Sequence, residues 1–265
     1  MNRIKIIIFV SILFNNFISG QLDPGAKQIS LSHSDIAFSN DVFSLFTNPS
    51  GLSKIPSSQF GIYYSPSPFG IKEMANAYLA FNQTTDLGSF AVGLLNYGFN
   101  LYKENKFCVG YGNNYNGKFY YGFSAYYESI AIKNYGNVNF FNILIGGSYS
   151  LSKELFLGFG INDILRNKEY SPNSASVRSG ISYMVLKNSI VHFSIFKQLN
   201  FPVSVCSGIE YDIIKYFSLR FGVQNNPDKY SAGAGINYSI FKVDYAVNQH
   251  KDLGLTHQLG ILINF

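Results

Sequence analysis

Apolar and polar residues alternate along most of this chain, from Gln59 to its last residue. A period of two residues is that of a β-strand with one apolar and one polar face. The final segment shows the pattern best, because every second position except one histidine is apolar. Those positions are Leu255, His257, Leu259, Ile261, Ile263 and Phe265. The residues between them are mostly small or polar, so the pattern predicts an all-β protein.

The same alternation recurs in about fourteen segments, which predicts about fourteen antiparallel strands. Their centres lie near Ile62, Tyr78, Val92, Val109, Phe123, Ile145, Phe159, Ile181, Phe193, Val205, Leu219, Ala234, Val243 and Leu259. Segment boundaries shift by a few residues when they are taken from sequence alone, so roughly twelve or sixteen strands also fit.

The connections between these segments are alternately short and longer. The short ones are 85–87, 114–117, 152–154, 186–188, 213–216 and 239–241, and the longer ones include 65–73, 97–106, 129–138 and 163–176. Bacterial outer-membrane barrels have short periplasmic turns, longer outer loops, an even strand number and both termini in the periplasm. The rhythm therefore predicts a transmembrane antiparallel β-barrel with periplasmic N- and C-termini.

A soluble β-sandwich also alternates, so composition is needed to separate the two architectures. Charged residues make up only 13% of the chain, against roughly 25% in soluble domains. Aromatic residues reach 17%, all of them Tyr and Phe. The apolar face recurs in nearly every segment, with polar residues or glycine opposite it. We therefore expect that face to contact lipid, and the soluble sandwich is the alternative.

The first twenty residues have the pattern of a secretory signal peptide. Arg3 and Lys5 precede the apolar stretch 6–14, and a small-residue cleavage site ends at Gly20. A buried N-terminal helix is the alternative. Beyond Gly20 no apolar stretch reaches the roughly 18 residues of a transmembrane helix. Because barrel-inserting machinery favours a last strand with a terminal aromatic such as Phe265, the leader and this strand together predict the outer membrane of a Gram-negative bacterium.

Residues 21–56 lie ahead of the first strand and do not alternate. We expect a short helix over Ser34–Phe46, ended by Asn48–Leu52, since a proline disfavours helix at the residue before it. A segment of this kind fits inside a barrel as a plug, and a periplasmic cap or tail is the alternative. The predicted organisation is a signal peptide at 1–20, a plug or cap at 21–56 and an outer-membrane β-barrel at 57–265.

Two motifs lie at opposite ends of the chain. The first consists of Gly25, Ala26, Leu31, Ala37, Asp41, Asn48, Pro49, Ser50, Gly51 and Leu52. The second consists of Val243, Asp244, Tyr245, Ala246, Asp252, Leu253, Gly254, Thr256, His257 and Phe265. They resemble the opening and the ending of the PorV/PorQ family of outer-membrane barrels, although this chain is short for that family and its outer loops are small.

This resemblance implies a fourteen-stranded barrel related to the FadL fatty-acid channel, with the N-terminal segment inside or under it. It also implies a non-enzymatic accessory role in type IX protein secretion or surface attachment, with secretion-system proteins or exported cargo as partners besides outer-membrane lipid. A FadL-like channel for small hydrophobic molecules is the alternative function. A structural barrel without a transport role is a third.

The charge of the chain also limits which classes of partner are expected. The formal net charge is +5, and without Arg3 and Lys5 of the leader it becomes 5 − 2 = +3. The lysines are scattered, so we expect no nucleic-acid partner. The polar faces of the strands carry Glu128, Arg178, Glu210, Arg220, Lys242 and Asp244. These charges are expected to hold the plug or to line a narrow permeation path, and simple solvation of the barrel interior is the alternative.

The chain offers few catalytic or metal-binding patterns. His192 and Ser194 have the spacing of the pair in outer-membrane phospholipase A, but the alternation directs both to the lumen, away from lipid. The four histidines and two cysteines are not clustered, so no metal site and no cofactor are expected. Cys108 and Cys206 are predicted to be free buried thiols rather than a disulfide.

Two glycine pairs have a better structural explanation than a nucleotide-binding one. Gly158 and Gly160, like Gly233 and Gly235, lie two residues apart on predicted strands. Glycine at such positions allows another backbone to approach the strand closely. We therefore expect these glycines to face the lumen and to contact the plug or a neighbouring backbone.

Overall fold

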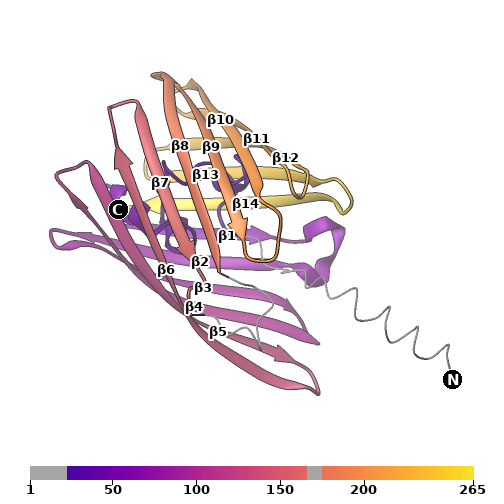
Figure 1. The fold of residues 1–265 in the computed structure, drawn as a ribbon. Coiled ribbons are helices and arrows are strands. Elements are labelled where there is room, and N and C mark those ends of the chain that lie inside the picture. The colour runs from indigo at the N-terminus through magenta and orange to yellow at the C-terminus, as the bar shows by residue number, and fades with distance from the viewer. Residues whose placement is uncertain (1–22, 166–174) are drawn as a thin grey trace.

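The computed structural model describes residues 23–165 and 175–265, and their strands close into a β-barrel (Figure 1). The predicted signal peptide lies outside the described residues. Each strand pairs antiparallel with the next along the chain, and the first pairs with the last. The expected antiparallel barrel of fourteen strands is confirmed, and each predicted strand centre lies within a strand.

The strands occupy the following ranges. They are β1 (Gln59–Ser65), β2 (Asn76–Thr85), β3 (Gly88–Phe99), β4 (Tyr102–Tyr115), β5 (Phe119–Ile132), β6 (Gly136–Ser150), β7 (Leu155–Asn162), β8 (Ser176–Leu186), β9 (Ser189–Gln198), β10 (Ser204–Ile214), β11 (Phe217–Gln224), β12 (Lys229–Tyr238), β13 (Phe241–His250) and β14 (Gly254–Asn264).

The alternation of the sequence becomes two different barrel surfaces. On β3, for example, the side chains of Phe90, Val92 and Leu94 are about half exposed on the outside, whereas those of Ser89 and Ala91 are buried inside. The same alternation of exposed and buried positions recurs around the barrel. The outer surface is therefore apolar and the inner one is small or polar, which is the arrangement of a barrel wall in lipid.

Two of the predicted long loops are wrong. Residues 97–106 and 129–138 were expected to form loops, but β3 and β4 pair as far as Phe99 and Tyr102, and β5 and β6 pair as far as Ile132 and Gly136. Polar residues on the outward face of these strand ends explain the error, because they interrupt the apolar pattern without interrupting the pairing.

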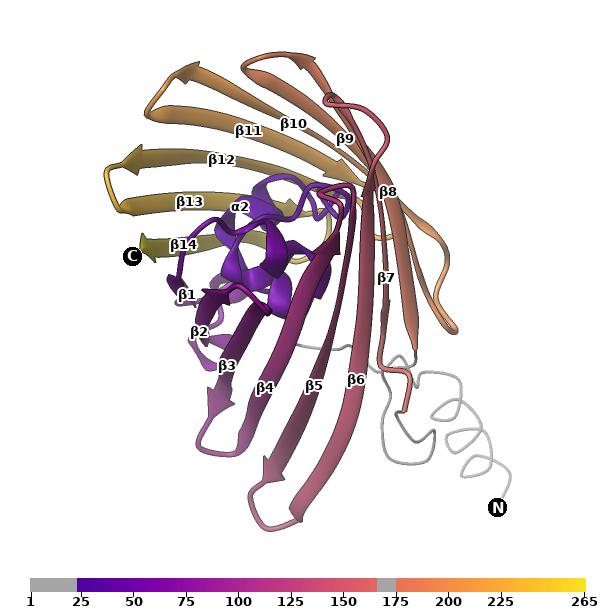
Figure 2. The same ribbon diagram turned by 90° about the vertical axis from the view of Figure 1, so that its left-hand side faces the viewer.

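Residues 23–55 lie inside the barrel, and we call them the plug (Figure 2). They form the α-helix α2 (Ala26–Ser30) and the 3₁₀ helices η1 (Val42–Phe46) and η2 (Pro49–Lys54). Most of their side chains are buried, so the plug supplies much of the apolar core of the barrel. Among the described residues, no helix is long and apolar enough to cross a membrane.

The helix expected over Ser34–Phe46 is wrong, because this stretch contains turns and only the short η1. Asp41 is extended and its side chain accepts a hydrogen bond from Phe43 N, so it caps a new helix inside the predicted one. Asn48 acts in the same way ahead of Pro49. The motif predicted to end a helix therefore begins one, with proline at its first position.

Candidate functional site at the interface of plug and barrel

Glycines of the barrel wall form a belt against the plug. At each of them an added Cβ would lie less than 3.0 Å from a plug atom, closer than real Cβ atoms come. They are Gly61, Gly93, Gly110, Gly112, Gly122, Gly146, Gly158, Gly180, Gly208, Gly222 and Gly233. The prediction that lumen-facing glycines let the plug approach is confirmed at Gly158, which meets Ala37, and at Gly233, which meets Ser30.

Four of the wall's glycines lie side by side. Gly112, Gly122, Gly146 and Gly160 are paired in register across the neighbouring strands β4 to β7. Thr47, Asn48 and Pro49 lie over this row, and the carbonyl of Pro49 would be 2.7 Å from a Cβ at Gly112. The strip without side chains is therefore the seat of Asn48 and Pro49, which begin the Asn48–Leu52 part of the first motif.

Asn48 joins two parts of the plug. Its Nδ2 donates to the carbonyl of Ile36 at 2.7 Å, and its Oδ1 accepts from the Ser50 hydroxyl at 2.8 Å. Ser50 also contacts Ser148 of the wall, with 3.2 Å between the two Oγ atoms. Asn48 and Ser50 are fully buried, so the motif fixes the plug to itself and to β6.

The other residues of this motif have packing roles. Leu52 is completely buried. Gly51 has no room for a side chain, because a Cβ there would lie 2.8 Å from both the carbonyl of Ser39 and the Cβ of Ser44. The motif therefore folds the plug onto itself.

One ionic cluster joins the plug to the opposite side of the wall. Lys27 lies 3.4 Å from Glu210, and Arg220 donates to Glu210 at 2.9 Å and to Asp244 at 2.5 Å. The side chains of all four are at most 14% exposed. Ion pairs shielded from water are screened little by salt, and breaking one leaves an uncompensated buried charge. We call Lys27, Glu210, Arg220 and Asp244 the ionic cluster.

The plug contributes further polar groups near the ionic cluster. Gln28 donates to Asp41 at 2.6 Å, and Lys27 donates to Asn40 at 3.2 Å. Burial lowers the pKa of Lys27, but the combined attraction of Glu210, Asp41 and Asp35 outweighs it and raises that pKa above its ordinary value. Lys27 therefore carries its charge at neutral pH, which the attraction to Glu210 requires.

The remaining charges predicted for the lumen also face inward. Glu128 pairs with Lys106 of β4 at 3.6 Å, and Arg178 lies 3.7 Å from Asp23 at the start of the plug. Lys242 precedes Asp244 by two residues and faces the same side of β13. The sequence thus located the wall charges, but it gave no sign that Lys27 would join them.

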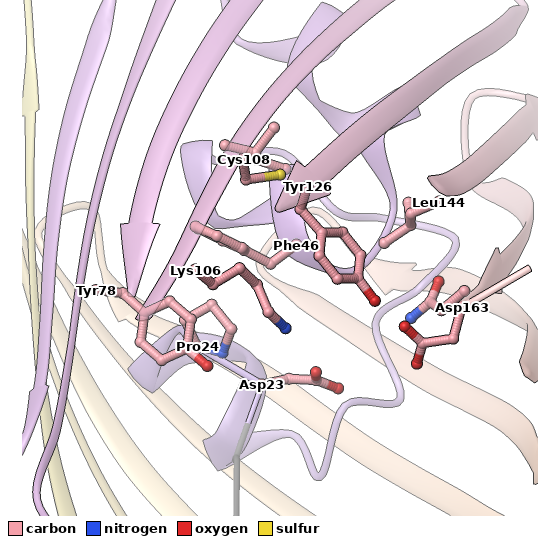
Figure 3. Close-up of a pocket in the computed structure, with 11 residues that line it drawn as sticks. Asp23, Pro24, Phe46, Tyr78, Lys106, Cys108, Tyr126, Leu144 and Asp163 are labelled. Atoms are coloured by element: carbon pink, nitrogen blue, oxygen red, sulfur yellow. The ribbon is translucent and has the colours of Figure 1, made fainter. Parts of the chain in front are cut away.

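A small cavity lies between the plug and strands β2 and β4 to β7 (Figure 3). Its volume is about 60 Å³, and its wall combines the rings of Phe46, Tyr78 and Tyr126 with the charged side chains of Lys106 and Asp23. A closed apolar cavity of about 150 Å³ is known to bind benzene. The cavity is therefore too small for an aromatic ring while the plug keeps this position.

The residues of the enzyme hypothesis face the lumen, as their alternation predicted. His192 Nδ1 is bonded to the Ser182 hydroxyl at 2.7 Å, while Ser194 donates to the carbonyl of His33 in the plug at 3.3 Å. Cys108 and Cys206 are free and buried, which confirms that prediction. Within the described residues, no group of three metal-ligating side chains gathers.

The C-terminal motif is divided between the two surfaces. Asp244 faces inward into the ionic cluster, whereas Tyr245 and His257 face outward and are joined by a 2.6 Å hydrogen bond. Gly254 has a φ of 92° where β14 begins. Phe265 N donates to the carbonyl of Ser58, which ties the end of the chain to the start of β1.

Comparison with known proteins places the fold. No protein-family model and no curated protein sequence matches the chain. Among solved structures it is similar to the Pseudomonas putida toluene transporter TodX, with 12% identity, a TM-score of 0.68 and coverage of 92% of this chain and 98% of that one. It is also similar to a Pseudomonas aeruginosa FadL homologue, with 9% identity, a TM-score of 0.64 and coverage of 92% and 99%.

A third similar structure is a TodX mutant described as a monoaromatic hydrocarbon channel, with 12% identity, a TM-score of 0.64 and coverage of 84% of this chain and 94% of that one. At such low identity the likeness defines the fold alone. The chain has the fold of FadL-type outer-membrane barrels, whereas the PorV/PorQ resemblance rests on the two end motifs.

Proposed function

We propose that this chain is an outer-membrane conduit for small hydrophobic molecules, closed by its plug until the plug shifts. The observation that carries the proposal is a plug seated on side-chain-free wall inside a barrel with the fold of a toluene transporter. Contacts with bare backbone are mainly van der Waals contacts, which are individually weak and collectively large. Movement of the plug therefore requires the polar bonds to the wall to break and a ligand to replace part of the apolar contacts.

The cavity beside Phe46 is the candidate ligand site. The rings and aliphatic carbons that line this cavity suit an apolar ring. The ammonium group of Lys106 lies 4.5 Å from the centre of the Tyr126 ring, so one face of that ring is already in contact with a cation. A shift of η1 that withdraws Leu45 and Phe46 would enlarge this space. The proposal therefore couples ligand entry to movement of the plug.

A secretion accessory of the PorV/PorQ type is the weaker proposal. Asp41 and Asn48 cap helices of the plug, and Asp244 anchors Arg220, so the end motifs have roles within the barrel itself. None of these roles requires a secretion partner. The fold also supports a location in the outer membrane, which either function needs.

The test is uptake of toluene by Gram-negative cells that lack a hydrocarbon channel of their own. Cells producing the wild-type chain should take up toluene faster than cells with an empty vector. Lys27→Glu should raise uptake severalfold further, because it places a second carboxylate against Glu210 and weakens the hold on the plug. Lys153→Glu, in an exposed turn, is the matched control and should behave as wild type.

Two results would count against the conduit. The first is toluene uptake equal to the empty vector in both the wild-type chain and Lys27→Glu. The second is a loss of export of proteins with type IX C-terminal signals when the chain is deleted in its own host, with toluene uptake unchanged. That second result would establish the secretion role instead.

A further inference from the structure

A row of polar side chains crosses the outside of four neighbouring strands. Asn96, Asn105, Ser129 and Asn139 lie directly opposite one another on β3 to β6. The next outward row, nearer the end of the barrel that holds Phe265, is entirely apolar. It consists of Leu94, Phe107, Tyr127 and Phe141, each about half exposed. On this wall the apolar surface therefore ends at a defined line.

A hollow of about 330 Å³ lies across that line on the outer surface of β2 to β5. Leu79, Leu94 and Phe107 line its apolar part, and Asn96 and Asn105 line its polar part. A volume of this size lies at the lower end of the range for small-molecule sites. The surface thus offers one mostly apolar depression with a polar edge at Asn96 and Asn105.

The polar edge of the hollow can bond to a ligand. Asn96 Nδ2 donates to Asn105 Oδ1 at 2.9 Å, and each carboxamide carries two N–H groups, so donors exist beyond that bond. Lys103 lies two residues beyond Asn105 on the same exposed face, opposite Gly98 and Ala131. Small residues on both sides leave the ammonium group accessible.

The acidic residues of these strands do not neutralise Lys103. Glu104 and Glu128 face the lumen and are at most 5% exposed. The exposed Glu73 belongs to the connection between β1 and β2, where Lys72 precedes it. The outside of β4 therefore presents a cation immediately beyond the polar row.

We propose that this hollow binds one lipid of the surrounding membrane, an acylated lipid with a phosphate-bearing, anionic headgroup. An acyl chain would lie against Leu94 and Phe107, the polar linkage would meet Asn96 and Asn105, and the phosphate would face Lys103. A second copy of the chain is the poorer occupant, because a two-fold contact would bring Lys103 against its own counterpart. The site is independent of the cargo of the barrel.

The absence of tryptophan makes the site measurable. A Tyr127→Trp reporter at the hollow can be quenched by lipids with brominated acyl chains. Tyr183→Trp on β8 is the control reporter, because Tyr183 is exposed to the same extent, 50% against 49%. Both are reconstituted with brominated phosphatidylglycerol or brominated phosphatidylcholine of identical chain length, in competition with unbrominated phosphatidylcholine.

At Tyr127→Trp we expect phosphatidylglycerol to bind about fivefold more tightly than phosphatidylcholine, the effect of one lysine near an anionic lipid. Lys103→Gln should abolish this preference. Lys197→Gln, which removes an outward lysine of β9, should leave it intact. The control reporter should distinguish the two lipids weakly or not at all.

Equal preference at the two reporters would overturn the proposal, as would a preference that survives Lys103→Gln. Weak quenching of Tyr127→Trp by both lipids, becoming weaker as protein density rises, would assign the hollow to a second copy. Retention of phosphatidylglycerol by the unaltered chain in native mass spectrometry, reduced in Lys103→Gln alone, would support the site without any reporter.

Discussion

At the scale of single residues, burial of Asp35 in the plug is unfavourable for its charged form. Its side chain is 3% exposed, and its Oδ2 has no hydrogen-bond partner within the described part of the chain. Burial raises the pKa of Asp35 to about 6 from its ordinary value of 3.8, with Lys27 opposing the shift and Asp41 adding to it. The seated plug therefore favours the protonated form of Asp35.

This shift predicts the pH dependence of Asp35→Asn. A carboxyl whose folded pKa is raised contributes its full stability below pH 3.8 and loses it as the pH rises through 6. Asp35→Asn should therefore stabilise the seated plug at pH 7.5, by on the order of 3 kcal/mol. Its advantage should shrink as the pH falls towards 4.

Hydrogen exchange of the plug amides measures the stability of the seated plug. The readout is the ratio of the amide exchange rates in the variant and in the wild type at each pH. A ratio that stays constant from pH 7.5 to pH 4 would show that Asp35 is not the titrating group. Lys54→Gln is a useful comparison, because burial lowers the pKa of Lys54 to about 8 from its ordinary value of 10.5. The effect of removing this charge should therefore stay constant from pH 4 to pH 7.5 and change only above about pH 8.

Local sequence rules were least reliable at the residue scale. The pattern marked Asp41 and Asn48 as important but did not identify them as N-caps, because a cap is recognised by the helix that follows it. Here both helices are short 3₁₀ turns without a repeating apolar pattern. No local sequence pattern identifies Lys27, since only the closed barrel brings it near Glu210.

At the scale of elements, the glycine row of β4 to β7 determines how closely the plug can sit. A Cβ at Gly122 would lie 2.5 Å from the backbone of Pro49, which cannot rotate away as a side chain could. Gly122→Val should therefore displace the η2 region from the wall. We expect faster exchange of the amides in residues 47–54, by tenfold or about 1.4 kcal/mol at least.

Gly260→Ala is the matched control for Gly122→Val. The nearest plug atom, the Cβ of Ala26, would lie 3.3 Å from the new methyl group, and a small adjustment can accommodate it. Heat-modifiable migration in gels should show that both variants still form barrels. Unchanged plug exchange in Gly122→Val would mean that the wall bends and that the glycine row is not the seat.

The strands themselves were predictable, because successive side chains of each strand alternate between an apolar exterior and a small or polar interior. The failures at 97–106 and 129–138 have one cause, the outward polar row that includes Asn105 and Ser129. A period-two pattern without apolar residues resembles a loop in sequence. Backbone pairing between strands does not depend on whether the outward side chains are apolar or polar. The strands therefore continue beyond the apolar part of the outer surface.

For the whole molecule, the lengths of the connections predict the direction of the barrel in the membrane. Short turns, such as those at Lys153 and Lys187, lie at the same end as Phe265, and the opposite end carries η3 (Pro68–Gly70) and η4 (Lys72–Met74). In bacterial barrels the short turns face the periplasm. The polar row and Lys103 would then lie in the outer leaflet.

Single cysteines test this direction. Lys133→Cys lies in the turn between β5 and β6 at the end away from Phe265, and Lys153→Cys lies in the turn between β6 and β7 at the end near it. Both positions are exposed, whereas Cys108 and Cys206 are 1% exposed and should not react. A membrane-impermeant maleimide should label Lys133→Cys on intact cells, and Lys153→Cys only after the outer membrane is opened. The reverse pattern would place the C-terminus outside the cell and would move the proposed lipid site to the inner leaflet.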